Sequence, residues 1–234
     1  MLRLFVAQPL AAGADVRLAG DDLRHLRVLR LGPGAPLRLV GPEGIEHEAV
    51  LVDLTGRDAV ARVGDAVPVR VESALDLVLA PALLKAPRMD LVVEKATELG
   101  VQRLVPVETR HAVARGAHLD RWRRIALAAA RQCRRTRVPT IEPPRPLRAL
   151  LEAPWPGVRV VASEHEDTTR LAALPAAAAA VIALVGPEGG FADDELVAAR
   201  AHGFVPLTLG PRVLRAETAA IVVAAHCQAR WGDG

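Results

Sequence analysis

The chain has 234 residues, 51% of them hydrophobic, and a formal net charge of +3. This length suffices for one large domain or two modest ones, and the apolar content excludes a globally disordered chain. No apolar run reaches the roughly 18 residues of a membrane span, and the first residues lack a signal-peptide pattern, so we expect a cytoplasmic protein. Two cysteines are too few for a disulfide framework, and the histidines show no paired ligand spacing, so we expect no metal site.

Residues 1–72 predict a small β-barrel, because short apolar segments alternate with turns rich in glycine and proline. One helix interrupts this pattern. Asp21 is a suitable N-cap for it, and Leu23, Leu26 and Leu29 form an apolar stripe that ends before Gly32. The predicted strands of this region are residues 2–6, 36–40, 46–52, 59–63 and 67–71.

The remainder of the chain has a different pattern, in which apolar runs of strand length alternate with helical periodicity. Such alternation predicts parallel strands connected by crossover helices. We therefore predict a second, α/β domain over residues 73–234, with the boundary within residues 70–74. Its predicted strands are residues 75–84, 101–107, 158–162, 180–185 and 204–209, and its predicted helices are residues 88–99, 119–135, 168–174, 192–202 and 217–231.

Arginines crowd the segment from Arg110 to Arg148, in which Asp120 and Glu142 are the only acidic residues. Guanidinium groups bind phosphates in a bidentate manner, and their pairing with a nucleic-acid backbone releases counterions. The segment therefore favours a nucleic-acid partner. The alternative is a solvated helix face in a chain that uses arginine rather than lysine throughout.

Two loops stand out because each leaves the carboxyl end of a late predicted strand, where open α/β sheets bind ligands. In the first, Gly186, Gly189 and Gly190 permit close approach of the backbone to a ligand, and Pro187 stiffens the turn. Taken alone this signal is weak. The same Gly-Pro-Glu-Gly tetrapeptide occurs at residues 41–44, where we predict only a hairpin turn.

The second loop covers residues 209–220 and leads into the last predicted helix. Arg215, Glu217 and Thr218 stand at the start of that helix. An isolated arginine and glutamate at a helix start usually form a cap and a salt bridge. Two such loops in this order, about two dozen residues apart, are far more specific than either alone.

Three further segments accompany these loops. The first has Lys85 and Arg88 before the run Lys-Ala-Thr-Glu-Leu-Gly-Val at residues 95–101. The second, at residues 132–139, contains Gln-Cys, Arg135 and Val-Pro, and the third has His25 followed by Val-Leu-Arg at residues 28–30. Together they resemble the ribosomal RNA small subunit methyltransferase E family over nearly the whole chain. That family methylates N3 of uridine in 16S rRNA. Arg131 and Arg134 depart from the pattern, because the family usually has Glu and Gly there, and residues 163–166 have no clear counterpart.

The resemblance implies an α/β fold of the SPOUT type, a knotted parallel sheet with flanking helices, preceded by a PUA-like β-barrel that binds RNA. It also implies S-adenosyl-L-methionine as cofactor and a homodimer that shares its site. The implied cofactor-binding residues are Ala162, Ser163, Leu184, Val185, Gly186, Pro187, Glu188, Gly189, Gly190, Leu209, Gly210, Val213, Leu214, Thr218 and Ala219. The implied RNA-binding residues are Arg30, Lys85, Arg88, Arg110, Arg134, Arg135 and Arg137.

The implied reaction removes a proton from uracil N3 and leaves an anion that needs a positive partner. We expect Arg215 to stabilise the uracil oxygens, and Glu217 to orient that arginine or accept the proton. The substrate would be a uridine in the decoding region of 16S rRNA, within the assembled small subunit. The alternatives are a SPOUT methyltransferase acting on tRNA or 23S rRNA, and a non-catalytic RNA-binding protein. A Rossmann dehydrogenase is disfavoured, because the first strand-to-helix turn, residues 80–88, contains no glycine.

Overall fold

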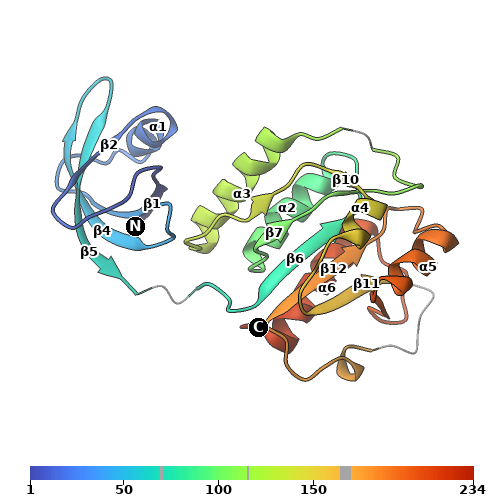
Figure 1. Ribbon diagram of the computed structural model, residues 1–234. Helices are drawn as coiled ribbons and strands as arrows, with labels where there is room; N and C mark the ends of the chain where they lie inside the picture. Colours follow the sequence, from blue (N-terminus) through green and yellow to red (C-terminus); the bar gives the residue numbers. More distant parts are fainter. Residues whose placement is uncertain (69–70, 115, 164–169) are drawn as a thin grey trace. The chain divides into compact units, whose positions relative to one another are not determined.

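The computed structural model describes residues 1–68, 71–114, 116–163 and 170–234. The chain divides into two compact units, Met1–Glu72 and Ser73–Gly234. Each unit has its own hydrophobic core (Figure 1).

The first unit is a five-stranded sheet with the strand order β1-β3-β4-β5-β2, in which only the β1–β3 pair is parallel. Within residues 1–68, β1 and β2 remain the two edges of the sheet, so the predicted barrel is an open sheet. Helix α1 contributes the buried side chains Leu23 and Leu26 to its core. The elements are β1 (Leu2–Phe5), β2 (Asp15–Leu18), α1 (Gly20–Val28), β3 (Pro36–Val40), β4 (Glu46–Leu54) and β5 (Ala59–Val67).

The first unit departs from the sequence prediction at several points. Strand β2 was missed. Strand β5 continues from the predicted residues 59–63 to Val67. Of the further strand predicted over residues 67–71, residues 68 and 71 are not in a strand, and residues 69–70 lie outside the described ranges. The N-cap of α1 is Ala19 rather than Asp21, which lies in the first turn. Leu29 is 51% exposed, because the helix ends at Val28 and the expected stripe stops with it.

The second unit is built on a six-stranded sheet with the order β13-β11-β12-β6-β7-β9, and all five strand pairs are parallel. This confirms the α/β class with a parallel sheet. A separate pair, β8 (Val107–Glu108) and β10 (Arg145–Pro146), is also parallel. The sheet strands are β6 (Asp76–Pro81), β7 (Arg103–Leu104), β9 (Thr140–Ile141), β11 (Val158–Ala162), β12 (Ala180–Val185) and β13 (Val205–Leu207).

Helices cover both faces of this sheet (Figure 1). Alternate side chains of β6 point to opposite faces: Leu77 and Leu79 pack in the cluster that contains α2, α3 and α6, whereas Val78 and Ala80 pack with α4 and α5. Strands buried on both faces need continuous apolar runs, and those runs made them predictable. The helices are α2 (Arg88–Glu98), α3 (Leu119–Cys133), α4 (Leu147–Glu152), α5 (Asp193–Ala201) and α6 (Ala216–Trp231).

Several boundaries in the second unit also differ from prediction. The strand predicted over residues 101–107 is divided between β7 and β8, and α4 was missed. Helix α3 ends at Cys133 because Arg134 adopts a left-handed conformation with φ of 68°. A helix was predicted over residues 168–174. Residues 168–169 lie outside the described ranges, and the remaining residues contain a 3-10 turn at Leu171–Ala173.

Candidate functional site

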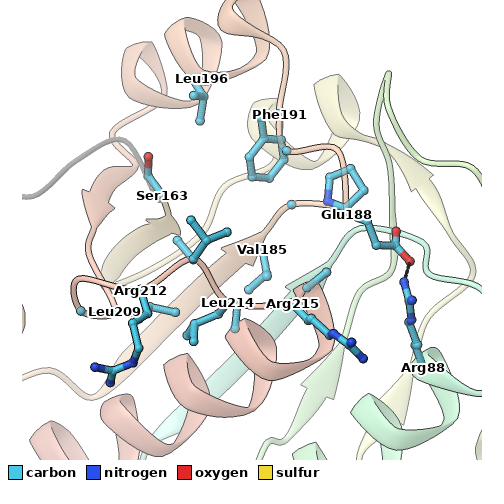
Figure 2. Close-up of a pocket in the computed structure, with 18 residues that line it drawn as sticks. Arg88, Ser163, Val185, Glu188, Phe191, Leu196, Leu209, Arg212, Leu214 and Arg215 are labelled. Atoms are coloured by element: carbon cyan, nitrogen blue, oxygen red, sulfur yellow. Dashed lines mark hydrogen bonds and ion pairs between the residues drawn. The ribbon is translucent and has the colours of Figure 1, made fainter.

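The carboxyl ends of three neighbouring strands, β11, β12 and β13, surround a cavity of about 420 Å³ (Figure 2). Parallel strands end at one edge of a sheet, so the loops that follow them are brought together there. The cavity wall consists of residues 162–163, residues 185–188 with 190–191, and residues 209–210 with 212–216, together with Arg88, Leu196 and Ala219. Both glycine loops singled out in the sequence thus line one cavity.

Most of the predicted cofactor-binding residues lie in this wall, namely Ala162, Ser163, Val185, Gly186, Pro187, Glu188, Gly190, Leu209, Gly210, Val213, Leu214 and Ala219. Three predicted residues lie outside the wall. Leu184 is fully buried in β12, Gly189 faces His111, and Thr218 is exposed on α6. The unmatched segment at residues 164–166 lies outside the described residues.

The sequence analysis missed four lining residues, Phe191, Leu196, Arg212 and Ala216, and it assigned a fifth, Arg88, to RNA. Phe191 could have been found, because it directly follows the glycines of the first loop. Leu196 could not, since it enters the wall from α5, and that contact depends on how the helix packs.

The first glycine loop has little room for side chains. A Cβ at Gly186 would lie 3.1 Å from the ring of Phe191. Gly190 has a φ of 70°, and its N–H donates to the carbonyl oxygen of Pro187 at 2.9 Å, which closes the turn. A side chain at Gly186 would therefore require the Phe191 ring to shift, and the positive φ of Gly190 favours glycine there.

Residues 110–111, which follow β8, hold this loop against the start of α5. The backbone N–H of Arg110 donates to Glu195 Oε1 at 2.8 Å, while Glu195 Oε2 accepts from the N–H of Ala192 at 2.9 Å. The Arg110 guanidinium pairs with Asp194 at 2.5 Å. His111 Nδ1 lies 3.2 Å from the carbonyl oxygen of Gly190. Arg110 therefore has a partner within the protein, although its side chain remains exposed.

The second loop approaches α6 in an extended conformation, with Arg215 as the N-cap residue at φ −64° and ψ 150°. Gly210 has a φ of 118°. In Figure 2 the side chains of Arg212 and Arg215 extend from this loop in different directions. Both residues line the cavity and both are exposed, so the wall presents two accessible guanidinium groups.

Charged side chains from three elements meet at the edge of the cavity. Arg88, the first residue of α2, donates from Nη1 to Glu188 Oε1 in the first glycine loop, as Figure 2 shows. Its Nε lies 3.7 Å from Oε1 of Glu217, which is buried in the first turn of α6. We expected Glu217 to orient Arg215 or to accept the proton; in the structure it forms an ion pair with Arg88.

Among the predicted RNA-binding residues, Arg135 does not fit that role. It is 3% exposed, and its Nη1 donates to the carbonyl oxygens of Thr97 at 3.0 Å and Val101 at 2.8 Å. The prediction for Arg135 was wrong, because a side chain turned into the core cannot reach a phosphate. The side chains of Arg30, Lys85, Arg110, Arg134 and Arg137 are exposed.

Both cysteines are free thiols in helices. Cys227 is fully buried in α6, and burial raises the pKa of its thiol to about 12. Across the described ranges, no three His, Cys, Asp or Glu side chains are grouped so that they could hold a metal ion. No helix in the same part of the chain is long and apolar enough to cross a membrane.

Residues 71–228 match the RNA methyltransferase domain family. A ribosomal RNA small subunit methyltransferase E of Mycobacterium bovis is 35% identical over 227 residues, which cover 90% of this chain and 84% of the relative. The crystal structure of that enzyme from Neisseria gonorrhoeae, bound to S-adenosyl methionine, is 33% identical with a TM-score of 0.95, covering 100% of this chain and 99% of that one.

A putative methyltransferase of Legionella pneumophila, in complex with the bound cofactor SAM, is 30% identical with a TM-score of 0.92, again over 100% of this chain and 99% of that one. Identities above 30% that extend over nearly the full length of both chains confirm the family predicted from the sequence motifs. The chain belongs to the ribosomal RNA small subunit methyltransferase E family.

Proposed function

We propose that this protein transfers a methyl group from S-adenosylmethionine to N3 of a uridine in the decoding region of 16S rRNA. One observation carries the proposal: both glycine loops line a single cavity at the carboxyl edge of the sheet. The Neisseria relative, which has this fold with a TM-score of 0.95, is a structure with S-adenosyl methionine bound.

The cavity has the size and lining that a nucleoside cofactor requires. Its volume of about 420 Å³ lies within the usual range of roughly 300–1,000 Å³ for ligand sites. Phe191, Leu196, Leu209 and Leu214 supply apolar surface for an adenine ring. The glycine-rich main chain at residues 186–190 brings backbone donors and acceptors to the wall, and the Ser163 side chain adds a polar group.

When bound, S-adenosylmethionine supplies an electrophilic methyl group. The protein must then hold the uracil ring in line with that group and take up the N3 proton. Arg215, exposed at the mouth of the cavity, donates to the uracil oxygens on which negative charge develops. Glu217 is the proposed proton acceptor. It lies two residues after Arg215 in the first turn of α6, is 8% exposed, and has a carboxylate oxygen, Oε2, without a hydrogen-bond partner among the described residues.

The proposed RNA contacts are the exposed cations Arg30, Lys85, Arg110, Arg134 and Arg137. Arg110 can exchange Asp194 for a phosphate at little cost, since exposed ion pairs contribute only about 0–1 kcal/mol. We propose that the Met1–Glu72 unit acts as the PUA-like RNA-binding module, and that the Ser73–Gly234 unit carries the methyltransferase site and the trefoil knot of the SPOUT class. The knot proposal is supported by the path of the chain, which leaves the edge strand β13 and returns across the carboxyl ends of the strands to α6.

We also propose that the protein is a cytoplasmic homodimer. Helix α6 supports the dimer, because its apolar surface extends beyond the face that packs on its own subunit. Ala220, Val223 and Ala224 are fully buried, whereas Ile221 and Val222 are also apolar but only half-buried. A two-fold partner would cover these remaining side chains.

The experiment that tests the function is methyl transfer to small ribosomal subunits from a strain that lacks the gene, followed by mass mapping of the 16S rRNA. We expect one modified uridine, methylated at N3, and no transfer to tRNA or 23S rRNA. Transfer to either of those RNAs would identify a different target. Binding of RNA without any cofactor binding would identify a non-catalytic RNA-binding protein instead.

A further inference from the structure

Arg88 connects three parts of the chain that are distant in sequence. It begins α2, its Nη1 donates to Glu188 in the loop that follows β12, and its Nε lies 3.7 Å from Glu217 in α6. Arg88 and Glu188 both line the cavity, and Glu217 lies directly after the lining residue Ala216. The guanidinium therefore lies where the first glycine loop meets the helix that bears the proposed proton acceptor.

The charges in this group do not balance, because one guanidinium faces two carboxylates. Glu188 retains 30% side-chain exposure and is partly stabilised by solvent, but Glu217 retains only 10%. Burying a carboxylate is costly unless a cation or hydrogen-bond donors compensate for the lost water. Arg88 is the cation that the structure provides for Glu217, and Glu188 competes for it.

We infer that Arg88 is a positioning residue for methyl transfer: it holds the Glu188 loop and Glu217 in one fixed arrangement beside the cavity. This inference rests on the proposed function and goes beyond it, because it assigns Arg88 to the catalytic geometry in place of an RNA phosphate. Without Arg88 the two carboxylates lack their shared cation, so the glycine loop and the start of α6 lose their common anchor.

The expected effect is on the rate of the chemical step. A displacement of about 1 Å in a group that positions the reactants can lower a rate by about a hundredfold. Arg88→Met should therefore reduce kcat by about that factor. The salt dependence of RNA binding should remain that of the wild type, because no phosphate contact is removed.

Arg103 offers a matched control, since it also lies between two carboxylates, Asp76 at 4.0 Å and Glu142 at 3.9 Å, with similar side-chain exposure. It does not line the cavity. Arg103→Met should keep the wild-type kcat, and its change in melting temperature shows what the loss of a comparable pair costs in stability.

The test measures kcat, KM for both substrates, and the salt slope of RNA binding, which is the slope of log K against log salt concentration. The proteins compared are the wild type, Arg88→Met, Arg88→Lys, Glu188→Gln, the double variant Arg88→Met/Glu188→Gln, and Arg103→Met. We expect Arg88→Lys to recover only part of the rate, because an ammonium group lacks the fork that reaches two carboxylates. Arg88→Met and Glu188→Gln each lower kcat, and their combined effect in the double variant should be smaller than the sum of the two in free energy. This is expected for two residues that act as a unit.

A normal kcat with a salt slope reduced by about one would overturn the inference and return Arg88 to phosphate binding. Additive losses in the double variant would also overturn it. If Arg88→Met does not fold, Glu188→Gln alone still tests the pair, and an unchanged kcat there contradicts the inference. An inactive wild type with bound cofactor, by contrast, would contradict the proposed function itself.

Discussion

The guanidinium of Arg135 donates a 2.8 Å hydrogen bond to the carbonyl oxygen of Val101, just beyond the carboxyl end of α2. It also donates to the carbonyl oxygen of Thr97, one of the last carbonyls of that helix. Helix ends leave carbonyl groups without intrahelical partners, and a cation placed there satisfies them and interacts favourably with the helix dipole. Arg135 thus joins the segment after α3 to the end of α2.

Arg135→Ala should lower the free energy of unfolding by about 2–4 kcal/mol, because it removes two charge-assisted hydrogen bonds from a buried site. Urea denaturation measures this as a lower midpoint. Arg134→Ala is the matched control at the neighbouring, exposed position, and it should change stability by less than about 1 kcal/mol. A normal unfolding midpoint for Arg135→Ala, together with a smaller salt slope of RNA binding, would restore its role as a phosphate contact.

Gly186→Val should weaken S-adenosylmethionine binding by at least about tenfold. The new Cβ lies only 3.1 Å from the Phe191 ring, so the ring or the loop must shift, and both line the cavity. Isothermal titration calorimetry measures the change in Kd. Gly32→Val is the control, because no atom lies within 4 Å of its added Cβ. Equal affinities for the wild type and Gly186→Val would remove this loop from the cofactor site.

Gly189→Val, at another glycine that the sequence assigned to the cofactor site, is expected to act differently. Gly189 lies outside the wall of the cavity, and a Cβ there would lie 3.3 Å from Cβ of His111. The substitution should therefore disturb the contact between His111 and Gly190 before it reaches the cofactor. A His111→Gly background removes the Cβ that lies 3.3 Å away and should reduce the effect of Gly189→Val on Kd.

Ile221→Asp and Val222→Asp should convert a dimer of about twice 24.9 kDa into a monomer or into insoluble protein. An unpaired carboxylate in a covered apolar interface costs several kcal/mol. Sedimentation velocity at micromolar concentration measures the mass, and methyl transfer should fall together with dimerisation. Val223→Asp is the contrasting variant: Val223 is fully buried within the subunit, so that substitution should prevent folding. A fully active wild-type monomer would reject the interface and the shared site.

Cys227 should resist alkylation in the native protein. Burial raises the pKa of its thiol from the ordinary value of 9.0 to about 12, so the reactive thiolate is scarce, whereas Cys133 is only partly buried. At about pH 8, mass spectrometry after iodoacetamide treatment should find Cys133 modified first. The raised pKa means that the unfolded chain loses this proton before the folded one does. The contribution of Cys227 to stability should therefore be present below pH 9.0 and be lost as the pH rises toward about 12. Equal labelling of both thiols in the folded protein would contradict this prediction.

Strands β3, β11 and β12 have the bounds that were predicted from the sequence. Strand β12 was predictable because a strand buried on both faces has an unbroken apolar sequence between turns. Helix α4 was missed. Its six residues pack Leu147, Leu150 and Leu151 against the sheet, but one and a half turns are too short for a clear helical period.

The candidate site was also predicted only in part from the sequence. The sequence pattern predicted that residues 186–190 and 209–214 would lie at one edge of the sheet, since both loops follow parallel strands, and the two loops line one cavity there. It could not determine what each arginine does, because a guanidinium has the same local pattern whether it is exposed or buried. Only the tertiary structure turns Arg135 into the core and brings Arg88 to Glu188, a residue one hundred positions away. Ion pairing depends on distances through space and on the loss of surrounding water, and both are decided by the packing of the folded chain.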